Sequence, residues 1–273
     1  MMYTFLRGIY SKLPQTQRRL ALDFYRHVVW LPQNITASIL KLFLKRKKIE
    51  DITKFEQKIY SQNGEDGILQ AIFEKIGTTN AFCVEFGVED GAECNTRYLI
   101  EKKGWQFLHM DCAENLPLSI KKEKITAENV NALFKKYNVP KEFDLLSVDI
   151  DSNDYWIWKA IQYSPRVVLI EYNAVIPSDQ SKTVVYNPNA RWDGTDYFGA
   201  SLLALVKLGN SKGYTLIGCE SCGVNAFFVR DELIERNFIA KSIEELYRPF
   251  RPGKRLGIKH PGYPRGNKQM ISV

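Results

Sequence analysis

Two patterns of hydrophobic and polar positions divide the chain. In the first part, apolar residues recur at helical spacing, as in RRLALDFYRHVVWL and ITASILKLFLKRKK, which predicts a helical N-terminal extension over residues 1–55. From residue 56, short apolar runs typical of strands alternate with helical segments. This alternation predicts an α/β domain over residues 56–246, built on a largely parallel sheet that helices cover on both faces.

Six apolar runs are predicted to be strands: AFCVEFG, FLHMD, FDLLSVDID, VVLIEYN, YTLIGCE and NAFFVR. Only residues 221–224 separate the last two, so they should form a hairpin, and the final strand should enter the sheet antiparallel. The remaining residues, 247–273, are rich in proline, glycine and basic side chains. They are predicted to form a tail that wraps the surface or becomes ordered on a ligand.

Charge is distributed unevenly behind a net value of +7. Residues 1–48 hold ten Lys/Arg and one acid, and the residues after Glu245 hold seven Lys/Arg and no acid. The part between them therefore carries 21 bases against 30 acids, or −9. Basic ends suit an anionic small molecule, and the basic run 45–48 beside an amphipathic helix also suits peripheral contact with an anionic membrane face. A solvated basic surface is the alternative for either end.

The cellular setting is expected to be cytoplasmic. No apolar run reaches the ~18 residues of a membrane-spanning helix, and the first residues do not read as a signal peptide. The five cysteines are odd in number and scattered, which argues against a disulfide framework.

The first predicted strand leads into an acidic glycine loop, FCVEFGVEDGAECN. Its glycines, Gly87 and Gly91, lack the three-glycine spacing of dinucleotide-binding folds. The acids of the loop would repel a pyrophosphate, whereas S-adenosylmethionine is cationic and carries no phosphate. Asp111 ends the next strand, where a carboxylate can accept both hydroxyls of a ribose. The loop and Asp111 together favour S-adenosylmethionine as the cofactor.

These motifs resemble the class I S-adenosylmethionine-dependent methyltransferases, and within them the FkbM-like branch, which is associated with sugar and secondary-metabolite methylation. The resemblance covers residues 58–232 and rests on SQNGEDGIL, VEFGVEDGAECNTRYL, GWQFLHMD, DLLSVDIDSNDYW and GVNAFFVR. It implies a Rossmann-like sheet of seven strands, the last antiparallel. It also implies cofactor-binding residues: Glu85, Gly87 and Gly91 around the methionine part, Asp111 at the ribose, Thr126 near the adenine, and Gln62 and Glu65 in the lead-in loop.

Acidic residues end the predicted strands FDLLSVDID and VVLIEYN. Alternation places Asp149 and Asp151 on one face of the first strand end, and Glu171 and Asn173 on one face of the other. Asp149, Glu171 and Asn173 resemble the ligand set of metal-dependent methyltransferases similar to catechol O-methyltransferase, which implies Mg²⁺ or Mn²⁺. Without a metal, Asp149 or Asp151 would be the catalytic base or a contact of the cofactor. Both alternatives remain open at this point.

A long insertion, AVIPSDQSKTVVYNPNARWDGTDYFGA, follows the predicted strand VVLIEYN. A loop of this length in a compact domain is usually functional. Its candidate substrate-binding residues are Tyr186, Arg191, Trp192 and Tyr197, which could stack on a sugar or pair with an anionic group. Packing of the same aromatic residues on the domain is the alternative.

The expected activity is methyl transfer to an oxygen of a sugar, or of a nucleotide-linked or otherwise anionic small molecule, in glycan (polysaccharide) or secondary-metabolite biosynthesis. Methyl transfer to a nitrogen stays open, because the residues of the cofactor half do not determine the acceptor. A second hypothesis is a membrane- or glycan-associated binding protein that keeps the fold without turnover, although converging acids argue against it. Nucleic-acid methylation is disfavoured because the acidic middle of the chain would repel a phosphate backbone.

Overall fold

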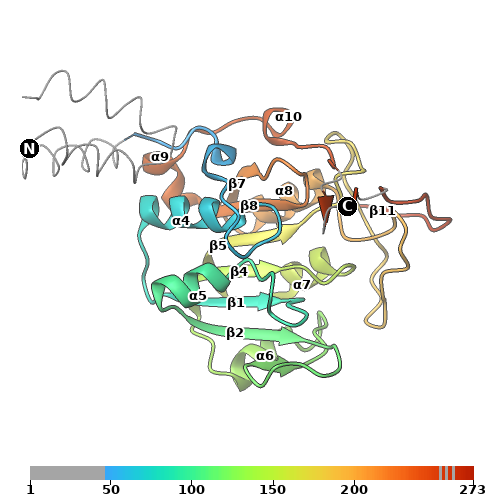
Figure 1. The fold of residues 1–273 in the computed structure, drawn as a ribbon. Helices are drawn as coiled ribbons and strands as arrows, with labels where there is room; N and C mark the ends of the chain where they lie inside the picture. The colour runs from blue at the N-terminus through green and yellow to red at the C-terminus, as the bar shows by residue number, and fades with distance from the viewer. Residues whose placement is uncertain (1–46, 252–253, 256–257, 260–261) are drawn as a thin grey trace, which may run out of the picture.

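The computed structural model describes residues 47–251, 254–255, 258–259 and 262–273 (Figure 1). The helices predicted within residues 1–46 lie outside this range. Among the described residues, no helix is long and apolar enough to cross a membrane. The helices are η1 (Ile52–Phe55), α4 (Glu65–Ile76), α5 (Arg97–Lys103), α6 (Val130–Lys136), α7 (Asp154–Ala160), α8 (Leu202–Ser211), η2 (Asp231–Leu233), α9 (Ile234–Asn237) and α10 (Ile243–Leu246).

A seven-stranded mixed sheet forms the centre of the molecule, in the order β3-β2-β1-β4-β5-β8-β7. Strand β8 pairs antiparallel with both β5 and β7, and the other neighbouring pairs run parallel. The predicted Rossmann-like fold with an antiparallel last strand is confirmed. The strands of this sheet are β1 (Phe82–Phe86), β2 (Gln106–Asp111), β3 (Ile120–Lys122), β4 (Glu142–Val148), β5 (Ser164–Glu171), β7 (Tyr214–Cys219) and β8 (Asn225–Arg230).

Alternating side chains of the strands fill two apolar layers. In β1, Val84 and Phe86 join the layer beneath α6, α7 and α8, whereas Cys83 joins the layer beneath α4 and α5. In β5, Val168 and Val167 divide between the layers in the same way. Burial on both faces explains why the strands appear in the sequence as nearly continuous apolar runs.

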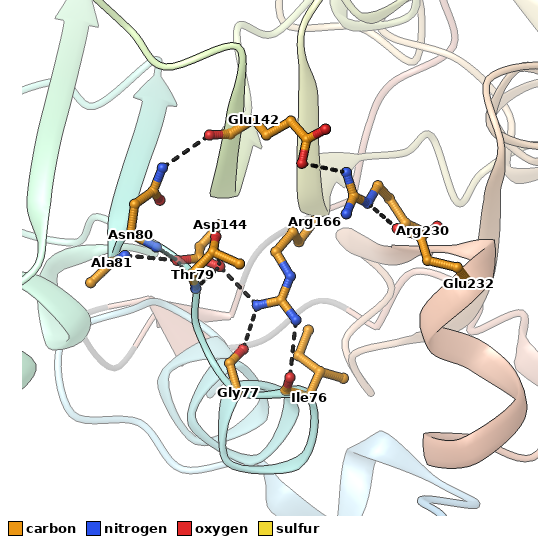
Figure 2. A network of polar contacts seen from close by, with 10 residues as sticks. All are labelled: Ile76, Gly77, Thr79, Asn80, Ala81, Glu142, Asp144, Arg166, Arg230 and Glu232. Carbon is orange, nitrogen blue, oxygen red and sulfur yellow. Dashed lines mark hydrogen bonds and ion pairs between the residues drawn. The ribbon is translucent and has the colours of Figure 1, made fainter.

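A network of polar contacts holds the amino-terminal edge of the sheet (Figure 2). Asp144 of β4 accepts hydrogen bonds from the backbone amides of Thr79, Asn80 and Ala81 and lies 2.9 Å from Nη1 of Arg166 in β5. Arg166 also donates to two carbonyls at the C-terminal end of α4. This buried pair therefore joins two strands to the end of a helix, far from the edge where ligands of such sheets bind.

At the opposite, carboxyl edge, the insertion after β5 lies beside the last described residues (Figure 1). The insertion contains β6 (Lys182–Thr183), which pairs antiparallel with β11 (Ile271–Ser272). A further short pair, β9 (Lys254–Arg255) with β10 (Ile258–Lys259), precedes β11 in the chain. Residues 262–273 therefore return to the edge of the sheet where the parallel strands end.

The folded body extends beyond the predicted limits of 56 and 246. Ile49 pairs with Phe238, and Ile52 is buried against Gly218 of β7. The five cysteines are free, in agreement with the prediction of no disulfide framework. Strand β3 was not among the six strands read from apolar runs, because only its first residue, Ile120, is buried.

Candidate functional site

Four neighbouring parallel strands, β2, β1, β4 and β5, end at one edge, so Asp111, Gly87, Asp149 and Glu171 lie on successive strands along that edge. Gly87 adopts φ 71, a left-handed conformation that glycine reaches without strain. Its α-carbon also lies so close to β4 that an added Cβ would be 1.5 Å from the backbone oxygen of Asp149. The turn after β1 thus needs glycine for both conformation and space.

Glu85 ties the glycine loop to the start of α5. Its carboxylate accepts hydrogen bonds from the backbone amides of Asn95 and Thr96, at 2.8 and 3.0 Å, and from the Thr96 hydroxyl at 2.6 Å. The Ser147 hydroxyl of β4 donates a further bond at 3.1 Å. The structure thus gives Glu85 a role in shaping the loop, and its predicted contact with a methionine group remains a prediction.

Asp111 supports the same loop from β2. One of its carboxylate oxygens accepts from the backbone amide of Glu89, a residue at φ 48, and the other accepts from that of Ala113. A carboxylate has about four lone-pair positions, so two remain for a ligand such as a ribose. Asp111 is therefore placed where its predicted role can be met.

Of the remaining predicted cofactor residues, Gln62 contacts the glycine loop and Gly91 belongs to it, whereas Thr126 and Glu65 have other partners. Nε2 of Gln62 donates to Glu93 of the loop at 3.1 Å, which brings the segment before α4 against it. Gly91, at φ 83, closes a turn onto Val88. Thr126 lies in the turn before α6, where it bonds Asn129. Glu65 is buried at the start of α4 and accepts a hydrogen bond from Asn225 of β8 at 2.9 Å.

A cluster of acids, which we call the acid cluster, consists of Asp149, Asp151 and Glu171. One carboxylate oxygen from each lies within 4.8 Å of the others. Asp151 follows β4 at φ 59, and this left-handed turn brings its side chain back toward the strand ends. Within the described part of the chain, Oε2 of Glu171 is buried without a hydrogen-bond partner.

The acids in and around this cluster destabilise one another when ionised. Burial raises the pKa of Asp149 well above its usual range, and the carboxylates of Asp154 and Asp151 raise it further. Burial and the charge of Asp149 likewise raise the pKa of Glu171. Burial also raises the pKa of Asp154, the first residue of α7, to about 7. Such a group is stable either with protons or with a bound cation.

Asp151 is exposed, but it lies close to acids of both the loop and the cluster. Partial desolvation raises its pKa, and so do the charges of Glu89 and Asp111, which belong to the glycine loop and its support. The carboxylate of Asp151 therefore lies within electrostatic reach of both the loop predicted to bind the cofactor and the acid cluster.

Asn173, predicted as a metal ligand, has structural contacts of its own. It is fully buried, and its amide nitrogen donates to the carbonyls of Asp196 and Phe198, both at 2.9 Å, while its oxygen accepts from Val175. Its side chain thus holds the insertion in place, and its role as a metal ligand remains a prediction. Asp151 is a further candidate ligand beside Asp149 and Glu171.

Three carboxylates, one with an unpaired buried oxygen, form a donor set of the kind that Mg²⁺ and Mn²⁺ prefer. The residues present therefore fit such a cation. A second group of side chains, Glu85, Cys94 and His109, also comes within 4.8 Å. This group fits a metal poorly, because His109 and Glu85 already contact the Thr96 hydroxyl and burial raises the pKa of the Cys94 thiol.

The four predicted substrate residues of the insertion have different positions. The Tyr186 hydroxyl accepts from the backbone amide of Ala127 before α6, and the Tyr197 hydroxyl accepts from Val185 within the insertion. These two tyrosines hold the loop. Trp192 remains 40% exposed and Arg191 is exposed, and their contact with a substrate remains a prediction.

Sequence reasoning missed two residues near the acid cluster. Asn225 of β8 lies opposite Glu171 in the strand register, and its Oδ1 is buried without a partner within the described residues. Tyr263 comes from the segment after β10, and the charges of Glu171, Asp149 and Asp151 act on its hydroxyl. Asn225 is the first residue of the second hairpin strand, β8, and this position could have indicated it. The sequence around Tyr263 contains no such signal.

Comparisons with known proteins identify similar structures. No family model matches the chain, and no curated protein matches it. The N-terminal domain of EvdMO1, solved in the presence of SAH and D-fucose, is 13% identical with a TM-score of 0.40 over 64% of this chain and 84% of that chain. The CMeT domain of the citrinin polyketide synthase is 11% identical, with a TM-score of 0.38 over 63% and 54% of the two chains. A S-adenosylmethionine-dependent methyltransferase from Clostridium acetobutylicum is 10% identical, with a TM-score of 0.35 over 62% and 92%. At such low similarity, none of these proteins assigns the chain to a family.

Proposed function

We propose that this protein is an S-adenosylmethionine-dependent methyltransferase of the class I type, of the FkbM-like branch, acting on an oxygen of a small acceptor. The observation that carries this proposal is the contact between the glycine loop and the acid cluster. The turn at Gly87 touches the backbone of Asp149, the first residue of that cluster. A cofactor on the loop and an acceptor on the cluster would therefore be neighbours.

The charge of the loop favours this cofactor over a dinucleotide. Glu89 and Asp90 are exposed on the loop, and Glu93 lies beside them. Two unit charges about 4 Å apart interact by about 1 kcal/mol even in water, so these acids oppose a pyrophosphate and attract a sulfonium and an ammonium group.

The chemistry requires an acceptor in line with the methyl group and a group to take its proton. In the transfer, the acceptor oxygen forms a bond to the methyl carbon while the carbon–sulfur bond breaks, leaving S-adenosylhomocysteine. Without a bound metal, the acceptor proton would pass to a carboxylate, for which Asp149 and Asp151 are the candidates. Burial and neighbouring acids raise the pKa of both, so each serves as the base only in its ionised form.

We further propose that the acid cluster holds Mg²⁺ or Mn²⁺ through Asp149, Asp151 and Glu171. When bound, such a cation lowers the pKa of a coordinated hydroxyl and orients it. The unpaired oxygen of Glu171 and the mutual repulsion of the three carboxylates support this assignment.

The proposed acceptor is a sugar, or a nucleotide-linked or otherwise anionic small molecule of glycan or secondary-metabolite biosynthesis. Exposed Arg191 and Trp192 on the insertion support an acceptor with an anionic group and a face that can stack. We also retain the proposal that the protein is cytoplasmic and that its basic N-terminal part contacts an anionic membrane face; residues 1–46 lie outside the described structure.

A methyl-transfer screen tests the proposal. The full chain is incubated with radiolabelled S-adenosylmethionine and free sugars, nucleotide-linked sugars, catechols and primary amines, with EDTA, Mg²⁺ or Mn²⁺. We expect label transfer to a hydroxyl compound, and its loss in Asp151→Asn but not in Glu232→Gln, an exposed acid paired with Arg230 at the other edge of the sheet. Cofactor binding without transfer to any compound would favour the binding-protein alternative, and transfer to amines alone would overturn O-methylation.

A further inference from the structure

Asn225 and Glu171 form a cross-strand pair at the edge where the parallel strands end. Asn225 begins β8 and lies opposite Glu171, the last residue of β5. The backbone amide of Tyr172 donates to the carbonyl of Val224, which makes the two opposed residues a non-hydrogen-bonded pair. In such pairs the side chains share one face of the sheet, with Cβ atoms about 4.5–5.5 Å apart. The side chains of Asn225 and Glu171 are therefore neighbours.

Glu65 fixes the orientation of the Asn225 amide. Nδ2 of Asn225 donates to Oε1 of Glu65 at 2.9 Å, and the backbone amide of Asn63 donates to the other oxygen of Glu65 at 2.8 Å. Rotation of the amide by half a turn would place its oxygen against the Glu65 carboxylate, where two acceptors repel each other. The amide oxygen of Asn225 therefore faces away from Glu65.

Two buried oxygens of the cross-strand pair lack a donor. Oδ1 of Asn225, a residue 3% exposed, and Oε2 of Glu171, 7% exposed, have no hydrogen-bond partner within the part of the chain that the structure describes. Burying a polar atom without a partner costs free energy. Since an amide oxygen and an ionised carboxylate both accept, neither satisfies the other. A cation between them would satisfy both.

The pair adjoins the proposed cation site, because Glu171 also belongs to the acid cluster. One carboxylate oxygen of Glu171 lies within 4.8 Å of those of Asp149 and Asp151. An amide oxygen adds a ligand to this cluster without adding negative charge. Carboxylates together with an amide oxygen are a donor set that hard divalent cations accept.

We propose that Asn225 is a ligand of the cation held by the acid cluster, through Oδ1, and that Glu65 positions it for this role. Metal ligands are commonly oriented in this way, by a carboxylate that accepts from the other end of the ligating group. The inference rests on the proposed function, because it takes the acid cluster as a site for Mg²⁺ or Mn²⁺.

Mn²⁺ alone is the probe that tests this role, on the full chain. Its binding is titrated by electron paramagnetic resonance in the wild type, Asn225→Ala and Asn225→Asp, and metal-free thermal unfolding shows that each variant folds. Asn131→Ala is the matched control. The side chain of Asn131 bonds Ala160 and Gln162, which precede β5 and so lie toward the other edge of the sheet.

We expect Asn225→Ala to weaken Mn²⁺ binding at least about tenfold, because loss of a residue that only supports a ligand already has an effect of this size. Asn225→Asp should bind Mn²⁺ more tightly than Asn225→Ala, since aspartate keeps a ligand oxygen. Aspartate cannot donate to Glu65, so a role through Glu65 alone would give no such recovery. Asn131→Ala should match the wild type.

A spectroscopic measurement identifies the ligand in the unaltered protein. Asparagine labelled with ¹³C at its side-chain carbonyl is incorporated, and electron–nuclear double resonance detects ¹³C next to bound Mn²⁺. We expect a ¹³C coupling in the wild type and in Asn173→Ala. The coupling should be absent from Asn225→Asp, whose carboxylate carries no label.

Equal Mn²⁺ affinity in the wild type and Asn225→Ala, or no ¹³C coupling in the Mn²⁺-bound wild type, would overturn the inference. A proton on Glu171 or a water molecule would then satisfy the two oxygens, and the acid cluster would remain a cation site without Asn225. No Mn²⁺ binding by the wild type would overturn the inference together with the proposed cation site. Failure of the wild type to bind S-adenosylhomocysteine in calorimetry is a separate result, which would overturn the proposed cofactor.

Discussion

A Cβ atom on Gly87 would lie 1.5 Å from the backbone oxygen of Asp149. The end of β1 and the end of β4 are therefore in contact through a position that accepts only glycine. This contact places the acidic glycine loop next to the acid cluster, so the two proposed binding regions depend on the same turn.

Replacement of Gly87 by alanine should therefore damage both regions. Gly87→Ala is expected to lower the free energy of unfolding by more than about 3 kcal/mol, because it adds a backbone clash to the strain of a positive φ, and to abolish S-adenosylhomocysteine binding. Gly104→Ala is the matched control: Gly104 has the same φ of 71 but nothing within 4 Å of an added Cβ. Its cost should be about 1 kcal/mol, with binding retained. Urea denaturation and calorimetry measure the two effects, and equal losses in both variants would contradict the argument.

Glu171→Gln should stabilise the metal-free protein while removing its response to Mn²⁺. The substitution relieves repulsion in the acid cluster, which we expect to raise the free energy of unfolding on the order of 1 kcal/mol. Saturating Mn²⁺ should stabilise the wild type by about 2.7 kcal/mol at a concentration of about 100 times Kd, and the variant by much less. Thermal unfolding with and without Mn²⁺ measures both.

Asn173→Ala distinguishes a ligand set of Asp149, Asp151 and Glu171 from the set predicted by sequence, which contains Asn173. Because the amide of Asn173 bonds backbone groups of the insertion, this variant should lose stability but keep most of the Mn²⁺ response. If Asn173→Ala loses the Mn²⁺ response and Asp151→Asn keeps it, the ligand set with Asn173 is the correct one.

The stability of the metal-free protein should fall as pH rises, because of Asp154. Folding raises the pKa of Asp154 from an ordinary value of 3.8 to about 7. Protonated Asp154 therefore contributes fully to the free energy of unfolding below about pH 4, and this contribution is lost as the pH approaches about 7. Asp154→Asn mimics the protonated side chain, whose Oδ1 accepts from Ile150. We expect a flatter pH profile and, near pH 8, a free energy of unfolding above that of the wild type. Parallel profiles for the two proteins in urea titrations across this range would refute the prediction.

The buried pair of Asp144 and Arg166 should be important for stability but not for ligand binding (Figure 2). Arg166→Met leaves Asp144 buried without its counter-charge, which is expected to cost about 3–5 kcal/mol. Lys136→Met removes an exposed partner of Glu123 and should change the free energy of unfolding little, because solvent screens such a pair. S-adenosylhomocysteine affinity, measured by calorimetry below the unfolding temperature, should be unchanged in both. A comparable cost for the two variants would contradict the assigned importance of the buried pair.

The fold could be predicted because its strands are buried on both faces and therefore stand out as apolar runs. The hairpin of β7 and β8 followed from the short connection between them. Strand β3 escaped prediction because its three residues carry little apolar surface and pair only at the edge of the sheet.

The site could be predicted only in part, because strand alternation ends where the strand ends. Alternation put Glu171 and Asn173 on one face, but the chain turns after β5 and Asn173 bonds the insertion. At Asp151, by contrast, a left-handed turn keeps the carboxylate with the cluster. Tyr263 could not be found by local patterns, since residues 262–273, which include it, are placed by contacts with Asp193, Asp196 and β6.

Calorimetry with S-adenosylhomocysteine and NAD on the full chain tests the central claim most directly. The acidic glycine loop and its contact with the acid cluster predict that S-adenosylhomocysteine binds one molecule per chain, that NAD gives no binding heat, and that Gly87→Ala removes the signal while Gly104→Ala keeps it. Binding of NAD in place of S-adenosylhomocysteine would contradict the account.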